Sequence, residues 1–192
     1  MNNPLLLFVG PSGCGKTTVA QELENKNNYK TIQSYTTRHK RYDNEIGHIF
    51  ISEDEFDALE NIVAYTQYNG HRYGTTKEQL DEAMSYVVDI PGVTTLLHNY
   101  TTKRPILVFY FDTTVTTRID RMLDRGDSDT AIIGRLHNDE AYDWFDKLES
   151  IVWKHNYKFH SNAELHKINA NKSMDEVIAQ ILYYAKRIME GY

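Results

Sequence analysis

Apolar runs alternate with helix-like patterns along most of the chain, and this alternation predicts a parallel β-sheet with helices on both faces. Three apolar runs are candidate strands, at residues 5–9, 85–90 and 105–111. The first of them, LLLFV, has no polar position, as expected for a strand covered on both faces. The pattern therefore predicts an α/β fold.

Helical periodicity marks the segments between and after these strands. Helices are expected at 16–24, 114–125, 130–153 and 173–189, with a short crossover helix at 92–100. In the last long helix, Ser173 and Glu176 have the spacing of a capping box, which predicts that the helix begins there. Val177 and Ile181 lie on one face of that helix and should pack against the sheet.

The stretch from about 36 to 80 has a different character, because it is polar and rich in Tyr, Thr and Gly. It predicts short strands at 49–52 and 63–68 around an acidic helix at 53–60. We interpret it as a small lobe inserted into one domain that spans residues 1–192, whose core comprises 1–35 and 81–192.

Composition excludes several classes of protein. The 192 residues include one cysteine, Cys14, which cannot form an intramolecular disulfide, so a reducing cytoplasmic location is expected. The apolar runs are too short for a membrane span, and the first residues lack the basic segment of a secretory signal. A net charge of -6 disfavours binding to a nucleic acid polymer. We expect neither a membrane nor a nucleic acid as a partner.

One motif carries clear chemistry. The segment GPSGCGKTT, residues 10–18, matches the P-loop pattern G-x-x-x-x-G-K-[ST] and stands between a predicted strand and a predicted helix. Its glycines allow backbone N–H groups to approach phosphate oxygens, Lys16 adds positive charge, and the Thr17 hydroxyl is a ligand for Mg²⁺. We therefore expect ATP and Mg²⁺ as cofactors, bound by Gly10, Ser12, Gly13, Gly15, Lys16, Thr17 and Thr18.

A second anion site is predicted in SYTTRHKR, residues 34–41. Arg38, Lys40 and Arg41 lie within four residues of one another in an acidic chain, and their repulsion is relieved only if an anion sits among them. Arginine suits two-point contact with phosphate. A basic loop in solvent is the alternative for this run taken alone.

The order of these motifs resembles the guanylate kinase family. The pieces that match are GPSGCGKTT, then S-x-TTR-x-x-R at 34–41, then YGT at 73–75. Further along, VVDIPGV (87–93), RMLDRGDSDTAIIGRL (121–136) and HSNAEL (160–165) look like the family's strand-end D-x-x-G segment, its lid and its late strand-end element. The resemblance implies a P-loop NTPase fold with an inserted acceptor-binding lobe and a helical lid at about 125–140.

The resemblance also implies roles for residues at matching positions. An acceptor monophosphate would bind to Ser34, Arg38, Arg41 and Tyr73, and Thr75 would contact the base. Lys16, Arg38, Arg125 and Arg135 would be catalytic, with Arg121 a further lid candidate. Asp89 would orient a Mg²⁺-bound water or contact the acceptor nucleoside, and Asn162 would belong to the ATP site.

Two departures from the family pattern concern the acceptor. The segment after Arg41 is two residues shorter, and a tyrosine that touches the acceptor phosphate has no clear counterpart; His48 and Tyr42 are the candidates to replace it. The glutamate that reads guanine falls on Ala64, with Tyr65 and Gln67 nearby. Loss of that carboxylate should weaken discrimination for guanine.

The sequence thus predicts ATP-dependent phosphoryl transfer to a nucleoside monophosphate, with GMP or dGMP first. One alternative is a related kinase that acts on a different (deoxy)nucleoside monophosphate or a phosphorylated sugar. Another is a non-catalytic guanylate-kinase-like binding module, which would typically lack Lys16, Arg125 and Arg135. The oligomeric state stays open between monomer and homodimer.

Overall fold

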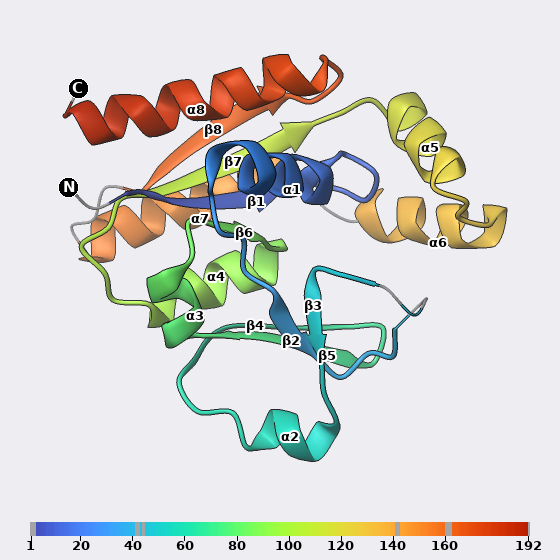
Figure 1. The fold of residues 1–192 in the computed structure, drawn as a ribbon, viewed down its shortest axis with the longest axis horizontal. Helices are drawn as coiled ribbons and strands as arrows, with labels where there is room; N and C mark the ends of the chain where they lie inside the picture. The colour runs from blue at the N-terminus through green and yellow to red at the C-terminus, as the bar shows by residue number, and fades with distance from the viewer. Residues whose placement is uncertain (1–2, 41–42, 44, 141–142, 160–162, 192) are drawn as a thin grey trace.

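The structure, a computed structural model, describes residues 3–40, 43, 45–140, 143–159 and 163–191. Its central sheet is parallel and has the strand order β6-β1-β7-β8 (Figure 1). The strands are β1 (Leu5–Val9), β6 (Ser85–Val87), β7 (Ile106–Asp112) and β8 (Glu164–Asn169). Every residue of β1 is fully buried, so the α/β prediction with a doubly covered sheet is confirmed.

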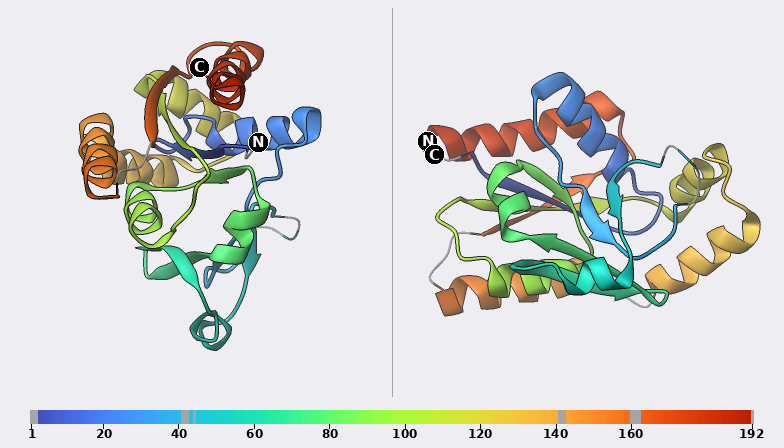
Figure 2. Two further views of the ribbon diagram at one scale, coloured as in Figure 1. Left: turned by 90° about the vertical axis from the view of Figure 1, so that its left-hand side faces the viewer. Right: turned by 60° about the horizontal axis from the view of Figure 1, so that its bottom comes forward.

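Two helical layers cover this sheet (Figure 2). Helices α1 (Lys16–Asn27) and α8 (Met174–Glu190) pack on one face, and α4 (Ile90–Asn99) and α7 (Trp144–Phe159) pack on the other. Alternate residues of β1 point to opposite faces: Leu6 and Phe8 join the α1/α8 cluster, and Leu5 and Leu7 join the α4/α7 cluster. The capping box that starts α8 is present as predicted.

A second sheet lies beside the core and is built from residues 34–76 (Figure 1). Its strands are β2 (Ser34–Thr36), β3 (His48–Phe50), β4 (Ile62–Tyr68) and β5 (His71–Thr76), in the order β3-β2-β5-β4. Helices α2 (Glu53–Asp57) and α3 (Lys77–Glu82) follow β3 and β5 along the chain. Asn69 and Gly70 both have positive φ, which closes the β4–β5 hairpin tightly.

Helices α5 (Val115–Asp124) and α6 (Asp129–Glu140) lie at one end of the molecule (Figure 1). The lid predicted at about 125–140 begins directly after α5 and includes α6, so we refer to these two helices as the lid helices. The prediction of one helix over 130–153 is wrong, because α6 and α7 are separate helices. The physical reason is that the two helices pack on different surfaces. The end of α6 contacts the loop after β1 through Asp139, whereas α7 buries Leu148 and Val152 in the sheet core.

Two strand boundaries also differ from the prediction. Strand β6 ends at Val87, and Asp89 caps α4 by accepting a hydrogen bond of 2.8 Å from the Gly92 N–H. The segment HSNAEL was expected to end a strand; that expectation is wrong, because β8 begins at Glu164 and ends at Asn169. Asn162 itself lies outside the described residues.

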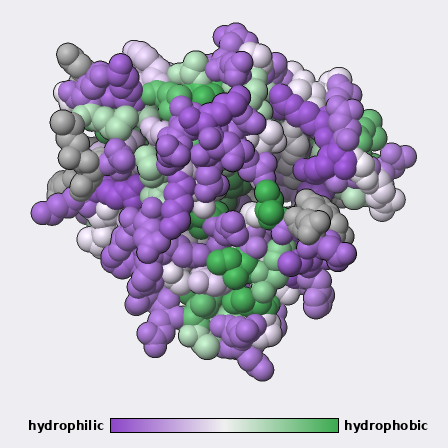
Figure 3. Space-filling view, viewed as in Figure 1, coloured by the Kyte–Doolittle hydropathy of each residue, from purple (hydrophilic) through white to green (hydrophobic). Residues whose placement is uncertain are grey.

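Hydrophilic residues cover most of the face seen in Figure 3, where hydrophobic residues show only in small separate groups. Within the part of the chain that the structure describes, none of the helices combines the length and the apolar character that crossing a bilayer requires.

Candidate active site

The loop between β1 and α1 places backbone N–H groups at the carboxyl end of the central sheet. Gly13 and Gly15 adopt φ values of +78° and +97°, which L side chains rarely tolerate. Gly15 is the N-cap of α1 and provides no side-chain hydrogen bond to the first turn. The N-terminus of α1 therefore keeps donors for an anion.

Lys16 is the first residue of α1, and its side chain folds back over this loop. Its Nζ donates to the carbonyl oxygens of Gly10 (2.7 Å) and Pro11 (2.9 Å). These neutral acceptors are weaker partners for an ammonium than phosphate oxygens. The flexible side chain can therefore turn to a phosphate without losing a strong interaction.

A cavity of about 580 Å³ opens over the loop, between the lid and the turn after β8. Five cationic side chains line it: Lys16, Arg121, Arg125, Arg135 and Lys172. Among the described lining residues, Asp124 is the one carboxylate. In a chain of net charge -6, this concentration of positive charge marks the cavity as a site for a polyanion.

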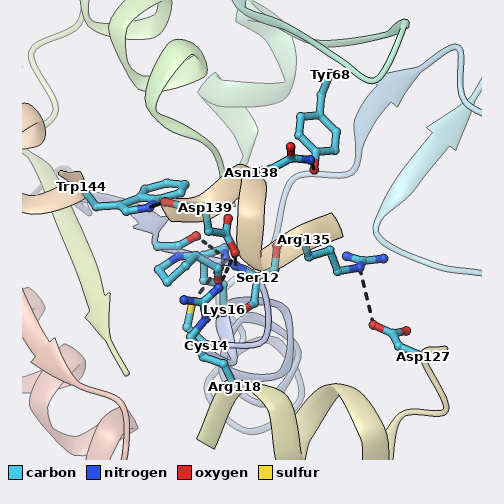
Figure 4. Close-up of polar contacts among 12 residues, drawn as sticks. Ser12, Cys14, Lys16, Tyr68, Arg118, Asp127, Arg135, Asn138, Asp139 and Trp144 are labelled. Atoms are coloured by element: carbon cyan, nitrogen blue, oxygen red, sulfur yellow. Dashed lines mark hydrogen bonds and ion pairs between the residues drawn. The ribbon is translucent and has the colours of Figure 1, made fainter. Parts of the chain in front are cut away.

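The two predicted lid arginines reach this cavity from different helices. The Arg125 Nε lies 3.2 Å from Asp127. The Arg135 Nε lies 3.6 Å from the same carboxylate (Figure 4). The Arg125 side chain is 52 % exposed, and exposed ion pairs contribute little free energy. Both arginines can exchange Asp127 for a more highly charged partner.

Arg121, in contrast, is occupied by backbone groups. It donates to the Cys14 carbonyl (3.1 Å) and the Ala170 carbonyl (2.8 Å). It thereby joins the β1–α1 loop to the turn after β8.

On the second sheet, three residues that the sequence suggested as ligands of the acceptor phosphate lie together: Ser34, His48 and Tyr73. Ser34 Oγ and His48 Nδ1 are 2.9 Å apart, and the His48 ring packs edge-on against Tyr73 at 5.5 Å between centroids. His48 therefore lies in the cluster where a substitute for the missing tyrosine was sought. Arg41 and Tyr42 lie outside the described residues.

Arg38 lies close to this cluster but is paired with Glu45. Its two terminal nitrogens contact the Glu45 carboxylate at 2.7 and 3.1 Å, and both side chains are nearly buried. Burial lowers the pKa of Arg38, but hydrogen bonding and attraction to Glu45 outweigh it and leave that pKa above its ordinary value. The buried Nε of Arg38 has no hydrogen-bond partner among the described residues.

Ala64 and Thr75 face each other across the β4–β5 ladder, and both are buried. Ala64 belongs to the hydrophobic cluster that includes α4. The Thr75 hydroxyl finds no hydrogen-bond partner within the described ranges. The small apolar side chain of Ala64 thus occupies the position of the expected base-reading glutamate. The neighbouring Thr75 hydroxyl can still form a hydrogen bond.

Asp89 is half-buried and is close enough to Lys16 of the P-loop and Thr66 of the second sheet to interact with both. Burial raises its pKa, whereas the Gly92 N–H, the Thr66 hydroxyl and the charge of Lys16 favour the ionised form. Its carboxylate holds the start of α4.

Several residues of this region had no role in the sequence analysis. Lys172 and Met174 line the cavity from the turn after β8 and from the start of α8, beside Val177, which was expected only to pack against the sheet. The signal that could have found them is the polar segment of residues 171–173, which lies just beyond the carboxyl end of β8, where ligands of parallel sheets bind. Arg118 and Asp139 both contact Ser12 (Figure 4), and no short-range pattern in the sequence indicates this.

Comparisons with known proteins place the chain in a family. A family model described as an AAA domain matches residues 6–145. The guanylate kinase of Clostridium tetani is 30% identical over 178 residues, which cover 77% of this chain and 84% of that protein. The guanylate kinase of Lactococcus lactis subsp. lactis is 32% identical over 143 residues, covering 69% and 70% of the two chains.

Among solved structures, the crystal structure of guanylate kinase from Anaplasma phagocytophilum matches with a TM-score of 0.54 and 16% identity. The match covers 96% of this chain and 85% of that chain. At this identity the likeness establishes the fold.

Proposed function

The chain belongs to the guanylate kinase family and is a nucleoside monophosphate kinase, and from this we propose that it transfers the γ-phosphoryl group of ATP to GMP or dGMP. The observation that carries the proposal is the cationic cavity of about 580 Å³, in which the P-loop and the lid arginines meet. Phosphoryl transfer needs a polyanion held in place and charge neutralised as it develops, and this cavity suits both tasks.

The donor side consists of the P-loop. Backbone N–H groups of residues 13–18 and the Lys16 ammonium would hold the phosphates of ATP, whereas the Ser12 N–H donates to Asp139. The Thr17 hydroxyl lines the same cavity and is a hard oxygen ligand suited to Mg²⁺. When bound, that ion supplies positive charge to the phosphate oxygens.

The acceptor side consists of the cluster on the second sheet. Ser34, His48 and Tyr73 provide hydrogen-bonding groups for the acceptor phosphate, and Arg38 provides a guanidinium. Because Arg38 is bidentate to Glu45 in this structure, it would either share its free Nε with the phosphate or leave Glu45 on binding. The role proposed for Arg41 rests on its place in the motif alone.

In the reaction, an oxygen of the acceptor phosphate attacks the γ-phosphorus while the bond to the β–γ bridging oxygen breaks. Arg125 and Arg135 would neutralise the charge spread over the transferred group. No covalent intermediate with the protein is needed, since positioning and charge neutralisation account for this class of catalysis.

We propose that discrimination between bases is relaxed. A site that pairs the polar edge of its substrate rejects analogues by about 10⁴-fold or more, because buried groups would otherwise be left unpaired. Ala64 offers no such group, and Thr75 offers one hydroxyl. We therefore expect the preference for GMP over other monophosphates to fall well below about 10⁴-fold. A different (deoxy)nucleoside monophosphate is accordingly the second candidate acceptor.

A panel assay tests the proposal. The protein is incubated with MgATP and each of the ribo- and deoxyribonucleoside monophosphates, and the diphosphates formed are separated and quantified. GMP and dGMP should give the highest kcat/KM. The Lys16→Ala variant is the control, and it should lose nearly all transfer while keeping the same circular dichroism spectrum.

Two results would contradict the proposal. Equal turnover by Lys16→Ala would mean that the P-loop does not bind the donor phosphates. Absence of any diphosphate from the wild-type protein would favour the non-catalytic binding module.

A further inference from the structure

A buried ion pair lies next to the P-loop and has no part in the chemistry proposed so far. Arg118 of α5 and Asp139 of α6 are in contact, and their side chains are 8% and 11% exposed (Figure 4). Such a pair adds little stability compared with apolar residues of the same size, because both charges must leave water. The pair instead fixes how α5 and α6 lie relative to each other.

Both partners of this pair also bind the backbone of one P-loop residue. The Asp139 carboxylate accepts a hydrogen bond of 2.9 Å from the Ser12 N–H, and the Arg118 Nε donates to the Ser12 carbonyl at 2.7 Å. The two lid helices are thus attached to a single peptide segment of the loop.

Gly13 makes this attachment possible. A Cβ atom at Gly13 would lie 2.7 Å from the Arg118 carbonyl oxygen, so the backbone of α5 approaches as closely as it does only because that side chain is missing. The close approach is therefore a property of the P-loop sequence as well as of the lid.

The pair and the lid arginines share the same helices. Arg125, the C-cap residue of α5, follows Arg118 by about two helical turns, and Arg135 precedes Asp139 on α6 by four residues. Each lid arginine therefore lies on the same side of its helix as one member of the pair. Any movement of Arg118 or Asp139 relative to Ser12 is therefore transmitted along the helix to a lid arginine.

A neighbouring contact joins the same end of α6 to the acceptor-binding sheet. The Asn138 Nδ2 donates to the Tyr68 hydroxyl at 2.9 Å, one residue before Asp139 (Figure 4). The end of α6 thus contacts both the donor loop and the β4–β5 hairpin.

We propose that Arg118 and Asp139 are positioning residues that hold the bases of both lid helices against Ser12, so that Arg125 and Arg135 converge over the transferred phosphoryl group. The inference rests on the proposed function for the reaction that the lid serves. The attachment of the lid to the P-loop can be measured without an acceptor.

The experiment compares Arg118→Leu, Asp139→Ala and the double variant with the wild-type protein. Each single change leaves one buried charge unpaired, so both single variants should melt at lower temperature. The double variant removes both charges and should recover most of the melting temperature. Its kcat should nevertheless stay at least tenfold below that of the wild-type protein, with a smaller change in either KM, because the lid arginines are no longer held in place.

A more exposed ion pair elsewhere in the fold serves as the control. Glu164 and Arg187 form an ion pair of 2.7 Å between β8 and α8, on the α8 face of the sheet. Arg187→Leu, Glu164→Ala and their double variant should shift the melting temperature without changing kcat.

Hydrogen exchange of the α6 amides, with and without MgADP, gives a readout that does not depend on phosphoryl transfer. Exchange should be faster in the double variant than in the wild-type protein. If kcat recovers together with the melting temperature, or if α6 exchanges equally in both proteins, the inference is wrong. If the wild-type protein transfers nothing but α6 exchange still differs, the proposed function fails and the attachment stands.

Discussion

His48 illustrates how one side chain can take over a position that a motif leaves empty. Its ring lies between Ser34, which it hydrogen-bonds at 2.9 Å, and Tyr73, which it packs against edge-on. An imidazole can donate to a phosphate oxygen as a tyrosine hydroxyl does, and it can also carry a positive charge. The site can therefore keep a hydrogen-bond donor for the acceptor phosphate, although the shortened segment after Arg41 lacks the expected tyrosine.

The first prediction concerns Arg38 and His48 as acceptor ligands. Arg38→Ala and His48→Ala should each raise the KM for the monophosphate at least tenfold, because a hydrogen bond to a charged group contributes about 1.5–3 kcal/mol. The KM for ATP should change little. Steady-state kinetics with each substrate varied in turn measures both constants.

His71→Ala is the matched control, since His71 lies on the same sheet at the start of β5. It should leave both KM values unchanged. A parallel rise of the two KM values in the Arg38 variant would show that this residue does not bind the acceptor selectively.

At the scale of elements, the P-loop joins three parts of the fold at once. It connects β1 to α1, and its Ser12 and Cys14 carbonyls accept hydrogen bonds from Arg118 and Arg121 of α5. The two arginine side chains thus provide hydrogen-bond donors for the Ser12 and Cys14 carbonyl oxygens. The loop conformation is therefore held by its neighbours as well as by its glycines.

A prediction follows for Gly13. Gly13→Ala should destabilise the protein by at least roughly 1–2 kcal/mol, because its φ of +78° is strained for alanine and the new Cβ would meet the Arg118 carbonyl. Chemical denaturation monitored by circular dichroism measures the free energy of unfolding.

Gly134→Ala is the comparison, since Gly134 lies inside α6 with open space around it. That change should stabilise α6 by roughly 0.5–1 kcal/mol, as alanine does in helices. Equal effects of the two substitutions would mean that the contact between Gly13 and α5 does not form.

The whole molecule has two cores, one on each face of the central sheet, and each face contains a histidine with a lowered pKa. Burial lowers the pKa of His155 on α7, and burial, opposed by nearby Glu164 and assisted by Arg187, lowers that of His166 on β8. His166 also stacks on Tyr184 at 3.9 Å between ring centroids. The folded state therefore favours the neutral form of both imidazole rings.

Stability should consequently fall in acid. A histidine whose pKa is lower in the folded state takes up its proton more readily when unfolded, so its contribution is complete above pH 6.5 and is lost as the pH falls below that value. The urea midpoint should be lower at pH 5.5 than at pH 7.5.

The double variant His155→Gln/His166→Gln should show a smaller difference between the two midpoints. His137→Gln, which replaces an exposed histidine on α6, should show the wild-type difference. An unchanged difference in the double variant would assign the acid sensitivity to other groups.

Local sequence patterns were sufficient to predict those elements that depend on a few consecutive residues. The apolar run of β1, the P-loop glycines and the Ser173–Glu176 capping box each depend on a few consecutive residues, and each has the predicted structure. The β4–β5 hairpin had a signal of the same kind in Asn69–Gly70, which the sequence analysis did not use.

The chain's own sequence determined the α/β class, the order of its motifs and hence its family, because strand burial and phosphate loops depend on short spacings. The tertiary structure alone decided that α6 and α7 are separate helices, that Glu45 pairs with Arg38, and that Arg118 and Asp139 meet at Ser12. The last contact joins residues more than 100 positions apart. No local propensity specifies such a pairing, since it exists only once separate helices have packed against the same loop.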